Sequence, residues 1–308
     1  MIKFFRVVMP SLVSAFAVTG CGGGSAGNPG SPPTSGVPSE LLSPSAGDAA
    51  AKGPTVAKIY VADFKLNNFG VLQTYTGTGT VVASTSSGFD GPQNIAVDGR
   101  GHVFVANFAK DQILSFTKAL KPYKASIPVP GDPVGLALGP KGKLYVTLYP
   151  SGTVTIFDQN GTQVPPTITG PGSITYVAVD RHGKIYVTSS VGNTLSTYKP
   201  DGTPTTPTIT AGLNGPGPVA VDSTGKIYVA NNPISGPSSI TTYNPDGTQT
   251  TPTIAVNEAH GVAVAKNGNI YVTDDTDKTV QTFKADGSLT TPTITGLSEP
   301  TGIAVLNR

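Results

Sequence analysis

VAVDSTGKIYVAN at residues 219–231 and VAVDRHGKIYVT at residues 177–188 are the stretches that decide the fold. Each contains a short apolar run, an aspartate, a polar turn with one glycine, and a second apolar run with a tyrosine in second place. Two apolar runs joined by a glycine turn are typical of a β-hairpin. Because the stretches resemble each other along their whole length, we expect one structural unit to be repeated.

The aromatic residue of the second run marks six copies of this unit, spaced 41 to 44 residues apart, at Tyr60, Phe104, Tyr145, Tyr186, Tyr228 and Tyr271. A third predicted strand ends in an aromatic residue and runs into Asn-Gly or Asp-Gly in four units, a strong hairpin signal. A fourth, rich in Thr and Pro, follows in four units, and proline favours the outer edge of a sheet. Four antiparallel strands per unit predict an all-β, six-bladed β-propeller.

The ends of the repeat region predict how the ring closes. The first unit lacks an innermost strand, whereas residues 301–308 form such a strand with no unit after it. We expect this C-terminal strand to pair into the first blade. The propeller should therefore span residues 56–308 as one domain.

The pattern G-[IVL]-A-[VL]-D-x-x-G-x-[IVL]-[YF]-V-[AT]-[DN] resembles the NHL repeat, and it recurs at 94–107, 135–147, 176–188, 218–231 and 261–274. The six-bladed architecture is similar to that of regucalcin/gluconolactonase-like and virginiamycin B lyase-like propellers. The resemblance implies the fold but not one function, because propellers of this kind include protein-binding modules, RNA-binding modules and an amidating lyase.

The N-terminal segment predicts export. Residues 1–20 carry Lys3 and Arg6, then an apolar run too short to span a bilayer, which is typical of a signal peptide. The apolar run ends at Val18, and the small residues after it lead to Cys21, the only cysteine, in a context that resembles the lipobox of bacterial lipoproteins. This resemblance implies acylation of Cys21 and insertion into the lipid bilayer. It places the chain in the bacterial cell envelope, at the outer membrane if the organism is Gram-negative. Residues 21–55, rich in Gly, Ser and Pro, should form a tether.

Composition excludes several classes of protein. Charged residues make up 12 % of the chain, and the net charge is only +2, which argues against a nucleic-acid binder. A single cysteine excludes an intrachain disulfide framework and a cysteine-based zinc ribbon. We expect a monomer.

One face of the predicted propeller gathers the loops after each second strand and before each first strand; we call it the mouth face, and the opposite one the turn face. Bases outnumber acids on the turn face, whereas the mouth face carries only Lys65, Lys110 and Lys278 as bases. The acids expected on the mouth face are Asp63, Asp90, Asp111, Asp132, Glu258, Asp274, Asp275, Asp277 and Glu299. An acidic mouth favours a cationic ligand and disfavours RNA.

Four residues of the mouth face share one repeat position, directly after the second strand: Asp63, Asn107, Asn231 and Asp274. Their oxygens could hold Ca²⁺ or Mg²⁺. The alternative is that they cap the adjoining loops, because Asp and Asn commonly bond nearby backbone. Asn94 is a further ligand-binding candidate. His260, which precedes Gly261 as a histidine does in virginiamycin B lyase-like propellers, is the candidate general base, with Glu258 or Asp274 as its partner.

We therefore expect a lipid-anchored extracytoplasmic propeller that binds a protein or a small cationic ligand at its acidic mouth, without catalysis. Two alternatives are a metal-dependent hydrolase or lyase of the lactonase kind, and a structural envelope protein.

Overall fold

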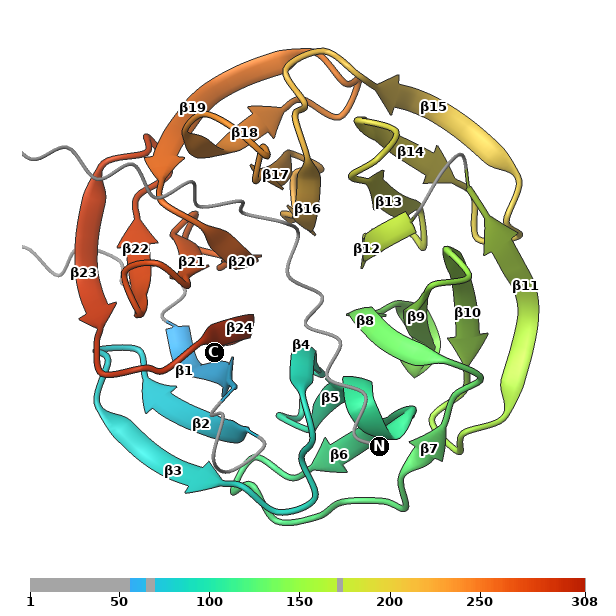
Figure 1. Cartoon of the computed structure of the whole chain (residues 1–308), viewed down its shortest axis with the longest axis vertical. Helices are drawn as coiled ribbons and strands as arrows, with labels where there is room; N and C mark the ends of the chain where they lie inside the picture. The colour runs from blue at the N-terminus through green and yellow to red at the C-terminus, as the bar shows by residue number, and fades with distance from the viewer. Residues whose placement is uncertain (1–55, 65–69, 171–173, 308) are drawn as a thin grey trace, which may run out of the picture. The chain divides into compact units, whose positions relative to one another are not determined.

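The computed structural model describes residues 56–64, 70–170 and 174–307, which form a ring of six four-stranded antiparallel sheets (Figure 1). The predicted fold class is confirmed. We name the blades A to F and give the strands of each from the innermost outward. Blades A to C consist of A (β24 Pro300–Asn307, β1 Val56–Asp63, β2 Val71–Thr76, β3 Val81–Thr85), B (β4 Pro92–Val97, β5 Val103–Asn107, β6 Gln112–Phe116, β7 Ile127–Pro128) and C (β8 Asp132–Leu138, β9 Leu144–Tyr149, β10 Thr153–Phe157, β11 Gln163–Thr169). Blades D to F consist of D (β12 Ile174–Val179, β13 Ile185–Ser189, β14 Thr194–Tyr198, β15 Pro204–Ile209), E (β16 Pro216–Val221, β17 Ile227–Asn231, β18 Ser238–Tyr243, β19 Gln249–Val256) and F (β20 Ala259–Val264, β21 Ile270–Asp274, β22 Thr279–Phe283, β23 Leu289–Ile294).

Two short 3-10 turns, Phe108–Lys110 and Pro140–Gly142, are the only helical elements among the described residues. Within that part of the chain, no helix has the length and apolarity needed to cross a membrane. The signal peptide, the acylated Cys21 and the tether were predicted for residues 1–55, which lie outside the described residues.

The aspartate of the repeat shapes the first hairpin of a blade. In blade E, Asp222 Oδ1 accepts the backbone N–H groups of Thr224 and Lys226 at 2.8 and 3.0 Å. Its other oxygen lies 3.2 Å from the hydroxyl of Tyr228, which is buried on the next strand. Gly225 then adopts a φ of +89°, a region that favours glycine. The spacing D-x-x-G therefore encodes a turn held by its own aspartate.

The glycine that opens the repeat pattern lets neighbouring innermost strands approach closely. At Gly302 in β24, an added Cβ would lie 2.6 Å from the carbonyl oxygen of Gln93 in β4 of the next blade. Beside it, Thr301 Oγ1 donates to the carbonyl of Pro92 at 2.8 Å. Small residues and threonine hydrogen bonds thus join the blades around the ring axis.

The outermost strands join the blades at the rim. The prolines lie on these strands, as predicted, and each packs on the turn glycine of the following blade, where a Cβ would come within 2.5 to 2.7 Å of a proline carbon. The pairs are Pro166 with Gly202, Pro207 with Gly247, Pro252 with Gly287, and Pro292 with Gly79. The last pair joins blade F to blade A.

The pairing of β24 with β1 closes the ring, as the missing innermost strand predicted. The antiparallel register joins Ile303 to Val61 and Val305 to Ile59. Ile303 and Ala304 are buried, at 5 % and 7 % exposure, and Ile303 belongs to a core cluster shared by blades A and F. One strand from the C-terminus therefore completes a blade that begins at the start of the propeller.

Deletion of residues 300–308 should lower the free energy of unfolding by far more than an ordinary terminal trim. Loss of one buried Ile costs about 2–5 kcal/mol by itself, and here a whole ladder is lost and an edge of β1 is exposed. Thermal unfolding measures the effect, and Leu289→Ala, at a side chain that is 63 % exposed, is the control with little change. An unchanged melting temperature after the deletion would contradict this mode of closure.

Candidate functional site

The four residues that share a repeat position are buried at the ends of their strands. Asp63, Asn107 and Asp274 have no measurable exposure, and Asn231 is 3 % exposed. Asp63 Oδ1 accepts the N–H groups of Ser298 and Glu299 at 2.9 and 2.8 Å. These amides belong to the loop that enters the blade from its neighbour.

The other three do the same in their own blades. Asn107 Oδ1 accepts the N–H of Asp90 at 2.7 Å, and Asn231 Oδ1 accepts that of Asn214 at 3.0 Å. Asp274 accepts three N–H groups, from Asn257, Glu258 and Asp277, at 2.9, 3.3 and 3.1 Å. Their hydrogen bonds favour the capping alternative over a shared metal site. Asn94, the remaining candidate, lies half-buried on β4.

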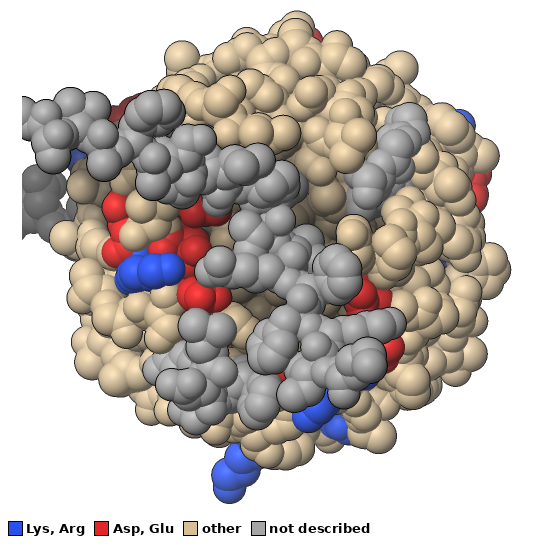
Figure 2. All heavy atoms as spheres, viewed as in Figure 1, with Lys and Arg blue, Asp and Glu red and all other residues tan. Residues whose placement is uncertain are grey.

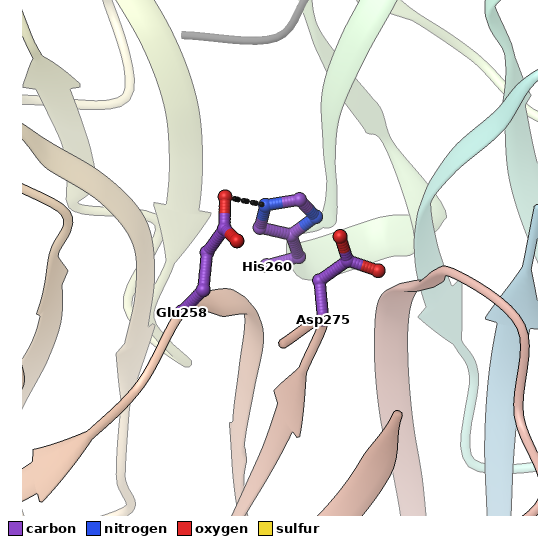
Figure 3. Close-up of side chains that lie close together, drawn as sticks. All are labelled: Glu258, His260 and Asp275. Carbon is purple, nitrogen blue, oxygen red and sulfur yellow. Dashed lines mark hydrogen bonds and ion pairs between the residues drawn. The ribbon is translucent and has the colours of Figure 1, made fainter. Parts of the chain in front are cut away.

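A different group of side chains meets on blade F. Glu258, His260 and Asp275 each direct a ligand atom to within 4.8 Å of the others (Figure 3), and this is the one group of three or more such residues among those described. His260 Nε2 lies 3.3 Å from Glu258 Oε1. In Figure 3 the His260 ring lies between the two carboxylates.

Local structure holds the three side chains in place. Glu258 directly precedes β20, and His260 is the second residue of that strand, at a shift in the register between Ala259 and Gly261. Asp275 follows β21, and its N–H donates to the carbonyl of Glu258 at 2.9 Å. The loop that positions this group is the one capped by Asp274.

The site is negatively charged and partly open to solvent. The His260 and Glu258 side chains are each 35 % exposed, and that of Asp275 is 20 % exposed. The hydrogen bond from His260, with smaller contributions from Thr276 and Lys278, lowers the pKa of Glu258 despite its burial. Lys278 Nζ contacts Asp275 Oδ1 at 2.9 Å. Figure 2 shows acidic side chains gathered over β20 and β21, and a wide uncharged area over blades D and E.

The sequence predicted two of the three residues of this group. His260 and its partner Glu258 are found together as expected. Asp274, the other predicted partner, is instead a buried cap, and Asp275 takes the place assigned to it. The E-x-H spacing was the available signal, because it keeps two possible ligands only two residues apart in the chain. The neighbour from β21 could be known only once the two strands were in register.

The donor atoms, one imidazole nitrogen and two carboxylates, suit a divalent cation. Carboxylates favour Mg²⁺, Ca²⁺ and Mn²⁺, whereas imidazole favours Zn²⁺ and other late first-row metals. An imidazole beside a carboxylate can also accept a proton from a bound molecule.

Comparison with known proteins supports the fold. The family model for the NHL repeat matches residues 256–283, the segment that contains Glu258, His260 and Asp275. Comparison with curated proteins finds no significant sequence match.

Several solved propellers superpose on the chain. A nidogen/laminin complex matches with a TM-score of 0.63 and 14 % identity, covering 80 % of this chain and 97 % of the other. A functionally unknown protein from Desulfotomaculum acetoxidans gives 0.59 and 14 %, covering 80 % and 98 %. Virginiamycin B lyase from Staphylococcus aureus, in a catalytically inactive form with quinupristin, gives 0.59 and 15 %, covering 82 % and 92 %. At these identities the likeness is one of fold, and it confirms the predicted resemblance to NHL-like and virginiamycin B lyase-like propellers.

Asp274→Ala and Asp275→Ala should separate the structural from the functional role of adjacent aspartates. Loss of Asp274 leaves three part-buried backbone N–H groups without their acceptor, so we expect a cost of about 2–4 kcal/mol in unfolding free energy. Loss of the partly exposed Asp275 should change stability by less than about 1 kcal/mol. Urea unfolding of the two variants measures the difference, and equal losses would contradict the capping role of Asp274.

Proposed function

We propose that this protein is a lipid-anchored, extracytoplasmic binding propeller that holds a divalent cation or a cationic ligand at its mouth face. The observation that supports the proposal is the convergence of Glu258, His260 and Asp275 within 4.8 Å. Two carboxylates and one lysine contact leave this group with a net negative charge, and the cap at Asp274 presets the loop that carries Glu258. A preset, negatively charged group of donors favours a cation over a neutral molecule.

The imidazole changes which cation we expect. A site made only of the oxygens of Asp63, Asn107, Asn231 and Asp274 would have favoured Ca²⁺ or Mg²⁺. The nitrogen of His260 instead favours Mn²⁺ or Zn²⁺ over Mg²⁺.

Titration of the purified protein with MnCl₂ and MgCl₂ in a calorimeter tests this function. We expect Mn²⁺ to bind more tightly than Mg²⁺, and Glu258→Gln, His260→Ala or Asp275→Asn to weaken Mn²⁺ binding at least about tenfold, which is ~1.4 kcal/mol. Asp111→Asn, at an exposed acid on blade B, is the matched control and should change binding by less than about twofold.

The titration also decides between functions. Binding that survives all three substitutions would exclude this group as the site. No binding of either cation would favour the alternative that the protein is a structural protein of the envelope.

A second candidate function is that of a metal-dependent lyase or hydrolase. The contact of His260 with Glu258 supports it, since a carboxylate orients an imidazole that acts as a general base. Virginiamycin B lyase shares the fold, so quinupristin is a reasonable first probe. Mass spectrometry separates the chemistries, because elimination within a ring leaves the mass unchanged and hydrolysis adds one water. Turnover that is abolished by His260→Ala would establish catalysis.

The lipid anchor is proposed on the sequence around Cys21. Two or three acyl chains would hold the protein in a bilayer, because each buried methylene contributes ~0.8 kcal/mol. A chain anchored in this way is exported and faces the cell envelope, at the outer membrane if the organism has one.

Cys21→Ser should move the protein from the membrane fraction to the soluble exported fraction, since the thiol is the site of acylation. Metabolic labelling with a radioactive fatty acid should mark the parent chain and not the variant. A variant that remains unlabelled but still sediments with membranes after a carbonate wash would show that the anchor lies elsewhere.

A further inference from the structure

The turn face carries an uneven charge. On blades A, B and C it holds seven bases and only two acids, Asp98 and Asp158. On blades D, E and F the charges nearly balance, with six bases against five acids. The seven bases of the first group are Lys58, Arg100, Lys118, Lys121, Lys124, Lys141 and Lys143, and we call them the basic sector.

Side-chain contacts make the basic sector continuous across three blades. Lys58 Nζ of blade A donates to the carbonyl of Lys118 in blade B at 2.9 Å. Within blade B, the rings of His102 and Tyr123 stack at 3.8 Å. Lys124 Nζ then reaches the carbonyl of Gln159 in blade C at 3.0 Å.

The acids within the sector do not neutralise these bases. The carboxylate of Asp98 contacts His102 and the N–H of Arg100. Asp158 accepts the N–H groups of Asn160 and Thr162 in its own turn. Among the described residues, none of the seven bases has an acid within ion-pair distance. Burial, together with the charge of Lys118, lowers the pKa of Lys58.

The chain enters the propeller beside this sector. Val56, the first residue of β1, pairs with Asn307 at the turn-face end of blade A, two residues before Lys58. The segment that carries the proposed lipid anchor is therefore joined to the propeller on its basic face, and the mouth face lies at the opposite ends of the strands.

We propose that the basic sector is a docking surface for anionic lipid headgroups. The choice of a membrane as the partner rests on the proposed lipid anchor, which would hold this face near a bilayer. Each Lys or Arg at an anionic surface is attracted within about a Debye length, ~10 Å at 0.1 M salt, so the sector acts only once the chain is close. Docking would turn the mouth face, with Glu258 and His260, away from the bilayer and toward its ligand.

Sedimentation with lipid vesicles tests the proposal on a chain that lacks the acyl anchor. Residues 22–308 contain the complete ring, whose six core clusters are all its own, and this chain lacks the acyl groups when made in the cytoplasm. We expect it to sediment with phosphatidylcholine vesicles that contain roughly 30 mol % phosphatidylglycerol and to be released by about 0.5 M NaCl. Pure phosphatidylcholine vesicles should not bind it.

Two triple variants locate the surface. Lys118→Gln, Lys121→Gln and Lys141→Gln together change three exposed side chains of the basic sector and should weaken vesicle binding on the order of a hundredfold. Lys199→Gln, Lys226→Gln and Lys284→Gln remove the same charge from blades D, E and F of the same face and should have an effect of less than about fivefold. Thermal unfolding checks that both triple variants fold.

Equal losses in the two triple variants would overturn the assignment to the basic sector. Equal binding to both kinds of vesicle would overturn headgroup recognition, and binding to heparin without binding to vesicles would replace the membrane with a soluble polyanion. The proposed Cys21 anchor and the proposed cation binding are tested separately, by membrane fractionation and by calorimetric titration. Vesicle binding by the unacylated chain would therefore establish the docking surface even if those proposals failed.

Discussion

The antiparallel ladder between β1 and β24 is the constraint on which the other parts of the structure depend. It joins the two ends of the propeller, so each blade has a neighbour on both sides and no innermost strand is left unpaired. The axial contact of Gly302 with β4 and the rim contact of Pro292 with Gly79 both lie at this junction. Because Glu258, His260 and Asp275 lie on blade F beside it, the geometry of the site depends on that closure.

Repetition explains why the most regular polar residues are not the site. Asp63, Asn107, Asn231 and Asp274 occupy one repeat position because, in four of the six blades, a buried side-chain oxygen there accepts backbone N–H groups of the loop that enters the blade. Binding requires a local exception to the repeat. Blade F supplies it, because Glu258 directly precedes its first strand, His260 is the second residue of that strand, and Asp275 follows its second strand.

The fold could be predicted from the sequence because each structural feature that builds it is encoded in a short stretch of residues. The aspartate and glycine of the first turn, the proline of the outer strand and the missing strand of the first unit all occur within short windows. The site was readable only in part. The E-x-H spacing is local, but the choice between Asp274 and Asp275 depends on which side of β21 each faces, and that follows from the cross-strand register and from the loop held by the cap.

The separation of charge between the two faces follows from the turn chemistry. On the turn face, aspartates such as Asp158 and Asp222 accept backbone N–H groups within their own turns, so these carboxylates are directed inward while the neighbouring lysines extend into solvent. On the mouth face, the capping positions fasten the loops, and Glu258 and Asp275 are left partly exposed beside His260. On blades A, B and C, a propeller built from such turns therefore presents an excess of lysines on the turn face, opposite the carboxylates of the mouth face. If a lipid anchor holds the first face near a bilayer, the second is the one that a ligand can reach.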